Sequence, residues 1–164
     1  MTTPRPDALR MRIELDPGVV RDPAWPEGVS VRSFDPADAH ALHALLVRGY
    51  SQGGGSVAEF VPWFSGMTSD EEYDPALFFL AESQAESRLA GAALCWTSAF
   101  VKDLVVDPSW RRRWLGESLL RHVFATFAAR GSGAVELKVE ATNAGAIRLY
   151  ERVGMRVVER LGLS

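Results

Sequence analysis

Hydrophobic positions along this chain follow two different periods. Over residues 29–34 and 135–139 apolar and polar side chains alternate, which predicts strands with one buried face. Over residues 115–130 apolar side chains recur every three or four positions, which predicts a helix with one buried face. The whole pattern predicts strands at 29–34, 77–83, 89–97, 100–106, 135–139 and 155–161, and helices at 36–50, 57–67, 115–130 and 144–153.

This order of elements predicts the fold class. It reads strand, two helices, three strands, helix, strand, helix, strand, which is typical of an α/β (α+β) protein. We expect a mixed, mostly antiparallel sheet with helices on both faces. Residues 29–164 are predicted to form one domain. Residues 1–28 are rich in proline and charge and are predicted to be an extension with one short strand at 11–15.

Composition narrows the classes of function. The chain has 164 residues, of which 47% are hydrophobic and 24% charged, as in an ordinary globular domain. Its net charge of −3 argues against nucleic acid as a partner, because such proteins carry a broad basic face. No apolar run approaches the roughly 18 residues of a membrane span, so we expect no membrane partner and a cytoplasmic location. The single cysteine, Cys95, lies in an apolar run and is interpreted as a buried core residue.

A basic turn precedes the predicted helix at 115–130. The apolar strand ending at Val106 leads into Arg111, Arg112 and Arg113, and the helix follows directly. Helix N-termini present unpaired N–H groups and the positive end of the helix dipole, so they bind phosphate readily. The three arginines therefore indicate a polyphosphate ligand. The alternative is a solvated basic turn that binds nothing.

A second motif lies near the end of the chain. Asn143 stands at the start of the predicted helix at 144–153, Tyr150 two turns later, and Gly154 ends it. Together the two motifs resemble those of the GNAT superfamily of N-acetyltransferases, which read Arg/Gln-x-x-Gly-x-Gly/Ala and Asn-x-x-Ala-x-x-Leu-Tyr-x-x-x-Gly-Phe. The matching positions here are Arg111, Gly116, Asn143, Ala146, Leu149, Tyr150 and Gly154, with Met155 in place of Phe.

The resemblance implies an N-acetyltransferase that moves the acetyl group of acetyl-CoA to an amine, in a small molecule or a peptide, without a metal. It implies that the backbone of Leu104, Val105 and Val106 lines the pantetheine arm. The pyrophosphate would be held by the segment Arg111, Arg112, Arg113, Trp114, Leu115, Gly116 and Glu117. Asn143 would contact the cofactor and Tyr150 would act as general acid. From spacing alone, Tyr150 could instead be a core aromatic and Asn143 a simple helix cap.

Three positions depart from the family pattern. Trp114 stands where the first motif has its middle glycine, and we expect a helical backbone there with the indole pointing away from the phosphates. The strand at 100–106 resembles that of polyamine acetyltransferases, but Lys102 replaces their Glu and only Asp103 remains. Asp103 is the candidate for anchoring the amine or relaying its proton; the alternative is a simple ion pair. Phe100 is the third departure, because it stands where mycothiol synthases have Glu. These departures favour a second function class, a non-catalytic acyl-CoA-binding or interaction module.

Two further features concern the rest of the chain. Residues 25–34 and 74–81 are similar to parts of mycothiol synthases, which carry two GNAT repeats where this chain carries one. The family also has a final strand, and residues 162–164 are too short to form it. Because an unpaired sheet edge invites pairing, we expect residues 11–15 to cover an edge, in the same subunit or across a homodimer.

Overall fold

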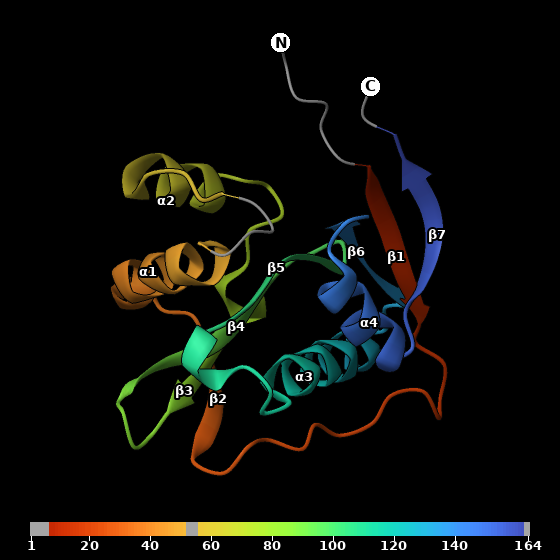
Figure 1. Ribbon diagram of the computed structural model, residues 1–164, viewed down its shortest axis with the longest axis horizontal. Helices are drawn as coiled ribbons and strands as arrows, with labels where there is room; N and C mark the ends of the chain where they lie inside the picture. The colour runs from red at the N-terminus through yellow and green to blue at the C-terminus, as the bar shows by residue number, and fades with distance from the viewer. Residues whose placement is uncertain (1–6, 52–55, 163–164) are drawn as a thin grey trace.

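The structure is a computed structural model that describes residues 7–51 and 56–162. Its core is a seven-stranded sheet in the order β2-β3-β4-β5-β6-β1-β7 (Figure 1). Neighbouring strands are antiparallel except β5 and β6, which are parallel. The strands are β1 (Ala8–Glu14), β2 (Val29–Ser33), β3 (Phe78–Ser83), β4 (Arg88–Trp96), β5 (Phe100–Val106), β6 (Ala134–Glu140) and β7 (Arg156–Leu161). The helices are α1 (Ala39–Tyr50), α2 (Phe60–Thr68), α3 (Leu115–Ala129) and α4 (Ala144–Arg152).

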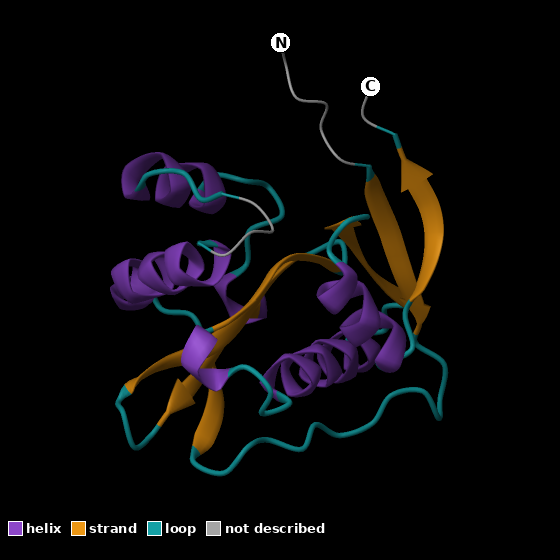
Figure 2. Ribbon diagram, viewed as in Figure 1, coloured by secondary structure: helices purple, strands orange, loops and turns teal. Residues whose placement is uncertain are grey.

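The predicted fold class is confirmed, and from β2 onward the elements follow the predicted order. The two helix pairs cover opposite faces of the sheet (Figure 2). Helices α1 and α2 bury one hydrophobic cluster against β3, β4 and β5. Helices α3 and α4 bury another, which also takes in β1 and β6. Strand β5 lies between the two clusters, so residues on it can reach either helix pair.

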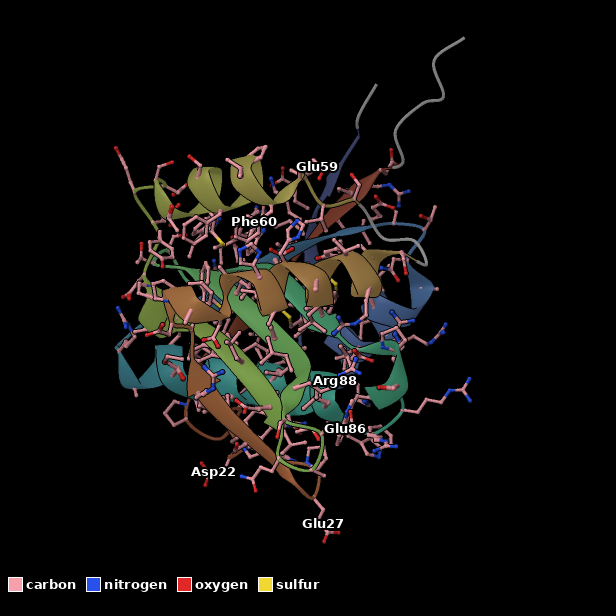
Figure 3. All side chains as sticks on the ribbon, turned by 90° about the vertical axis from the view of Figure 1, so that its left-hand side faces the viewer. Asp22, Glu27, Glu59, Phe60, Glu86 and Arg88 are labelled. Carbon is pink, nitrogen blue, oxygen red and sulfur yellow. The ribbon has the colours of Figure 1, made fainter. Side chains whose placement is uncertain are left out.

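Local chemistry explains why α1 begins where it does. The carboxylate of Asp35 accepts a hydrogen bond from the backbone N–H of Ala37, and the carboxylate of Asp38 accepts one from the N–H of Asp35. This reciprocal cap forms around Pro36 in a short 3-10 turn that leads into the helix. Helix α2 begins at Phe60, three residues later than the pattern predicted. The Phe60 ring lies between the two helices and stacks on His40 at 3.9 Å (Figure 3).

Strand β1 joins the sheet within its own chain, one of the two arrangements predicted for residues 11–15, although it is not the edge strand. It lies inside the sheet, between β6 and β7, and is antiparallel to both within the same chain. Its alternation explains the fit: Leu9, Met11 and Ile13 are buried in the cluster under α3 and α4. On the other face, Arg10 pairs with carboxylates of both neighbouring strands. The N-terminal strand thus pairs with β6 and β7 of the same chain, and no exchange between subunits is needed to place it.

Strands β5 and β6 are joined over a very short length. Only Phe100 and Val101 pair with β6, opposite Glu136 and Leu137. Beyond these pairs the two strands separate, so residues 102–106 of β5 have no paired strand on the side of β6. A sheet that opens in its middle exposes backbone groups of two strands to one space. The candidate site lies there.

Candidate active site

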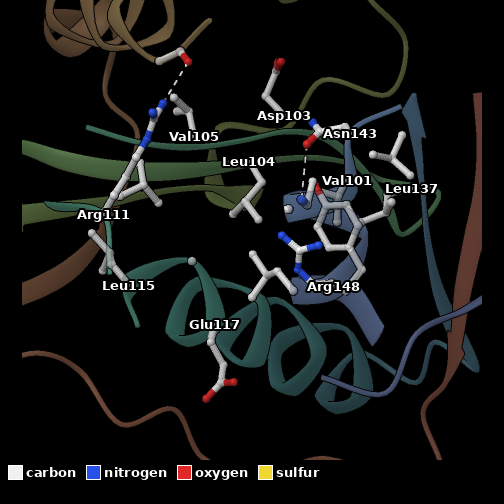
Figure 4. A pocket seen from close by; sticks show the side chains of 18 of the residues that line it. Val101, Asp103, Leu104, Val105, Arg111, Leu115, Glu117, Leu137, Asn143 and Arg148 are labelled. Carbon is white, nitrogen blue, oxygen red and sulfur yellow. Dashed lines mark hydrogen bonds between the residues drawn. The ribbon is translucent and has the colours of Figure 1, made fainter. Parts of the chain in front are cut away.

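A cavity of about 1150 Å³ fills the space where β5 and β6 separate (Figure 4). Residues 101–106 of β5 line one wall and residues 137–140 of β6 line the other. The turn before α3 and the inner side of α4 complete it. The cavity therefore contains both segments that the motifs singled out, although Glu117 and Asn143 are 26 positions apart in sequence. Of the predicted site residues, all but Arg113 line it.

The turn before α3 adopts an unusual backbone. Arg112 and Trp114 both have positive φ, 67° and 63°, a left-handed conformation that glycine adopts more easily. Our expectation that Trp114 is helical is therefore wrong: it is the left-handed residue that precedes the first turn of α3. The turn is tight because the chain must leave β5 and enter α3 within a few residues. The N–H groups of the first helical turn have no partner within the helix and face the same region.

The indole of Trp114 lies mostly in solvent. The side chain is 64% exposed, and the guanidinium of Arg152 lies over its ring at 5.1 Å. Although Trp114 is among the residues that line the cavity, most of its side chain is thus accessible to solvent. The next glycine, Gly116, serves a packing purpose, because a Cβ there would lie 3.1 Å from the side chain of Leu149. Glycine at this position lets α3 and α4 approach each other.

The three arginines of the turn have different surroundings. Arg111 donates a hydrogen bond to the backbone oxygen of Gly49 at 3.2 Å, across to the end of α1 (Figure 4). Arg112 is exposed and lines the cavity. Arg113 stacks its guanidinium over the ring of Trp110 at 4.5 Å. The structure therefore brings Arg111 and Arg112 to the cavity.

A buried carboxylate fixes the start of this turn. Asp107 is 4% exposed and accepts hydrogen bonds from the backbone N–H and hydroxyl of Ser109. It also pairs with Arg48 of α1 and Arg88 of β4, at 3.0 and 2.8 Å. Burial alone would raise the pKa of this carboxyl, but the hydrogen bonds from Ser109, Arg88 and Arg48 outweigh it and lower the pKa to about 2. Asp107 was not among the predicted residues, and its position after the apolar strand was the available signal.

Asn143 and Tyr150 lie on α4 beside the cavity. The side-chain oxygen of Asn143 accepts a hydrogen bond from the N–H of Ala146 at 3.2 Å, so the asparagine caps the helix (Figure 4). Tyr150 is 9% exposed yet lines the cavity. Burial, with a contribution from the negative charge of Asp103, raises the pKa of Tyr150 to about 12. The hydroxyl is therefore protonated throughout the physiological range and can donate a proton.

Asp103 is held by two neighbours. Its Oδ1 accepts a hydrogen bond from the hydroxyl of Tyr50 at 2.7 Å, and its Oδ2 lies 2.7 Å from the ammonium of Lys102. Burial and then the charge of Asp103 raise the pKa of Tyr50, so that hydroxyl stays protonated. The ion pair that we kept as an alternative is thus present, and it lies inside the cavity with Tyr50, Lys102 and Asp103 all among the lining residues.

Tyr50 is the main residue that sequence reasoning missed. It reaches Asp103 because α1 ends very close to β5: a Cβ on Gly49 would overlap the side chain of Val105. Only glycine permits this approach. A glycine directly before an aromatic at a helix end was the available signal, but nothing in the sequence indicates that this end contacts β5.

Comparison with known proteins identifies the family. A model of the acetyltransferase (GNAT) family matches residues 39–155. The chain belongs to the GNAT family. A mycothiol acetyltransferase from Clavibacter michiganensis is 38% identical over 147 residues, covering 80% of this chain and 44% of its own length. The [ribosomal protein bS18]-alanine N-acetyltransferase of Escherichia coli K12 is 31% identical, covering 76% of this chain and 79% of its own.

Solved structures agree with this assignment. A GCN5-related N-acetyltransferase from Sphaerobacter thermophilus superposes with a TM-score of 0.83 at 31% identity, over 98% of this chain and 51% of that one. The chain spans about half the length of this structure and of the mycothiol acetyltransferases that it matches. Membership of the GNAT family explains why the two motifs, far apart in sequence, line one cavity.

Three further properties of the described residues concern metal ligands, the cysteine and membrane-spanning helices. Within residues 7–51 and 56–162, no group of three or more His, Cys, Asp or Glu side chains is arranged to hold a metal ion. Cys95 is buried and burial raises the pKa of its thiol, so it is a poor nucleophile. Across the same residues, no helix has the length and apolar character to cross a membrane.

Proposed function

We propose that this protein transfers the acetyl group of acetyl-CoA directly to an amine, with Tyr150 as the general acid. One observation carries the proposal: Tyr150 and the first turn of α3 line the same cavity, between strands that pair with each other at only two positions. A phosphate-binding helix start and a proton donor in one cavity are what transfer from a nucleotide-linked thioester requires. Family membership supports the same assignment.

The cofactor would lie along β5 and against α3. Its pyrophosphate would meet the N–H groups of residues 112–117 and the side chains of Arg111 and Arg112, because helix N-termini attract anions. Its pantetheine arm would run beside Leu104, Val105 and Val106, where β5 has no neighbouring strand. An amide-rich arm placed there can pair with the free backbone groups, as a strand would. Asn143 would hold the start of α4 against this arm.

The chemical step needs a proton donor and a proton acceptor. The neutral amine attacks the thioester carbonyl, the C–N bond forms, and the C–S bond breaks. Sulfur takes the proton of the Tyr150 hydroxyl and leaves as the thiol. A proton from the amine nitrogen restores the tyrosine, and the proton that the ammonium form carried goes to solvent. Asp103 would hold the incoming amine close to Tyr150, whose pKa already reflects its charge.

Binding and transfer are tested separately. Calorimetry with CoA and acetyl-CoA should show binding of both, and release of free thiol should rise when a suitable amine is added. The amines to compare are amino acids, polyamines, aminoglycosides and short peptides, since the relatives' names include both a small thiol metabolite and a protein alanine. Binding without transfer to any amine would favour the non-catalytic acyl-CoA-binding module. Absence of binding would overturn both functions.

A further inference from the structure

Lys102 and Asp103 are neighbours in sequence, yet their side chains meet. In a regular strand successive side chains point to opposite faces. Here the register of β4 and β5 shifts. Leu94 pairs with Asp103 and Cys95 pairs with Val101, so Lys102 has no partner residue on β4. This is a β-bulge, a feature that re-aims side chains and often lies next to active sites.

The bulge turns Lys102 to the side of the sheet that faces α1 and α2. Its ammonium lies 5.7 Å from the centre of the Trp96 ring, which packs against the hydrophobic cluster beneath those helices. Val101, the residue before it, is buried in the opposite cluster under α3 and α4. A cation and an anion therefore stand side by side in the wall of the cavity, which also contains Tyr150.

Both charges are partly shielded from water. The side chains of Lys102 and Asp103 are 26% and 13% exposed. An acceptor with only an ammonium group would approach Asp103 against the positive charge of Lys102, which lies 2.7 Å from the same carboxylate. An acceptor that also carries a carboxylate avoids this repulsion. Its amine can pair with Asp103 and its carboxylate with Lys102, so one internal ion pair is replaced by two.

We propose that Lys102 and Asp103 form a recognition pair for a zwitterionic acceptor, a free α-amino acid. This inference rests on the proposed function, because it names the acceptor for that same cavity. The amino and carboxylate groups of an α-amino acid are attached to one carbon atom. The ammonium of Lys102 and the carboxylate of Asp103 are likewise adjacent, 2.7 Å apart. Tyr50 donates a hydrogen bond to the other oxygen of Asp103 and lines the same cavity, so it limits the rotation of that carboxylate.

The test compares free amino acids with their carboxamides, which keep the amine and lose the negative charge. For the full-length protein with acetyl-CoA, kcat/KM should favour the free acid. Lys102→Met keeps an unbranched side chain of similar length beside Trp96 and removes the charge, so the ratio of acid to carboxamide should fall at least tenfold. Comparing this ratio between variant and wild type cancels the difference in amine basicity between the two acceptors. Lys102→Arg keeps the charge and should keep the preference for the acid.

The matched control is Lys138→Met, because Lys138 lines the same cavity from β6 and is exposed. An equal loss of preference in this control would mean that general positive charge is responsible and would overturn the pair. A wild-type preference for carboxamides, or a ratio unchanged in Lys102→Met, would also overturn the inference while leaving the acetyltransferase intact.

Calorimetry of the same amino acids with the CoA-loaded protein separates the two failures. If an amino acid binds to the wild type but not to Lys102→Met, and its amine is not acetylated, the recognition pair stands and the proposed function is overturned. Neither binding nor transfer with any amino acid, while other amines are acetylated, would overturn the recognition pair alone. Neither binding nor transfer with any amine would overturn both.

Discussion

The two sides of β5 differ in how their functional residues are assembled. On the side of α3 and α4, the turn at 111–117 and the helix that carries Asn143 and Tyr150 are each set by a short local segment. On the side of α1 and α2, Tyr50 meets Asp103 across 53 positions of sequence, and the bulge gives Lys102 its direction. The first side carries the GNAT motif positions, with Trp114 as its departure, and the second carries Lys102.

This difference has a physical origin. The cofactor is the same in every reaction of this type, so its half of the site can be built from fixed local motifs. The acceptor varies, and in the proposed function its half consists of side chains that a neighbouring helix brings to β5. Changes on the first side should therefore affect the cofactor and the chemical step. Changes on the second should affect acceptor choice.

The largest effect is expected for Tyr150→Phe. The ring packing is kept and only the hydroxyl is lost, so turnover should fall on the order of 10²-fold, the low end for a general acid. The affinity for acetyl-CoA should change by less than about 1.5 kcal/mol, the contribution of one neutral hydrogen bond. Steady-state kinetics and calorimetry measure the two quantities. Tyr50→Phe, on the other side of β5, should mainly raise KM for the acceptor. Full turnover in Tyr150→Phe would make this tyrosine a core residue.

Asp107 joins the two sides, because it bonds both to Arg48 of α1 and to the turn before α3. Its lowered pKa stabilises the fold above the ordinary carboxyl pKa, about 3.9, and this contribution is lost as pH falls toward 2. Asp107→Asn should therefore lower the free energy of unfolding by about 2 kcal/mol at neutral pH. The gap to wild type should close between about pH 4 and 2.

Urea unfolding at a series of pH values measures this gap. Asp22→Asn is the control, since Asp22 is an exposed carboxylate outside the turn. A gap independent of pH would mean that the variant loses packing rather than charge.

A smaller effect is expected for Arg112→Gln. This arginine lines the cavity at the start of α3, and loss of its charge should weaken CoA binding about tenfold, within the range of one charge-assisted hydrogen bond. The loss should shrink at high salt. Arg21→Gln, a change at an exposed arginine outside the cavity, should leave binding unchanged. Equal effects of the two changes would mean that only net charge matters.

The smallest effect is expected for Trp114→Gly, which restores the family's residue. Because the indole is exposed and stacks on Arg152, its removal should change CoA affinity by less than about threefold. A tenfold gain in affinity, measured by calorimetry, would show that the indole obstructs the phosphates. That result would mean that the indole, and not only the backbone of Trp114, lies against the cofactor.

Some local structures in this protein could be predicted from the sequence and others could not. The capped start of α1 at Asp35, the amphipathic face of α3 and the Asn143 cap of α4 were predictable, because each depends on residues within a few positions. The left-handed backbone of Trp114 was not, because a tryptophan adopts it only where the surrounding turn requires it. The Lys102 bulge was also hidden, because a register shift depends on the partner strand as much as on β5.

The sequence by itself determined the order of the elements, the family and the motif residues, since periodicity and helix caps act locally. Only the tertiary structure decided the position of β1 between β6 and β7, the separation of β5 from β6, and the contact of Tyr50 with Asp103. Each of these depends on which distant segments share a sheet or a helix contact. Such contacts are selected by the burial of the whole core, so no local pattern can specify them.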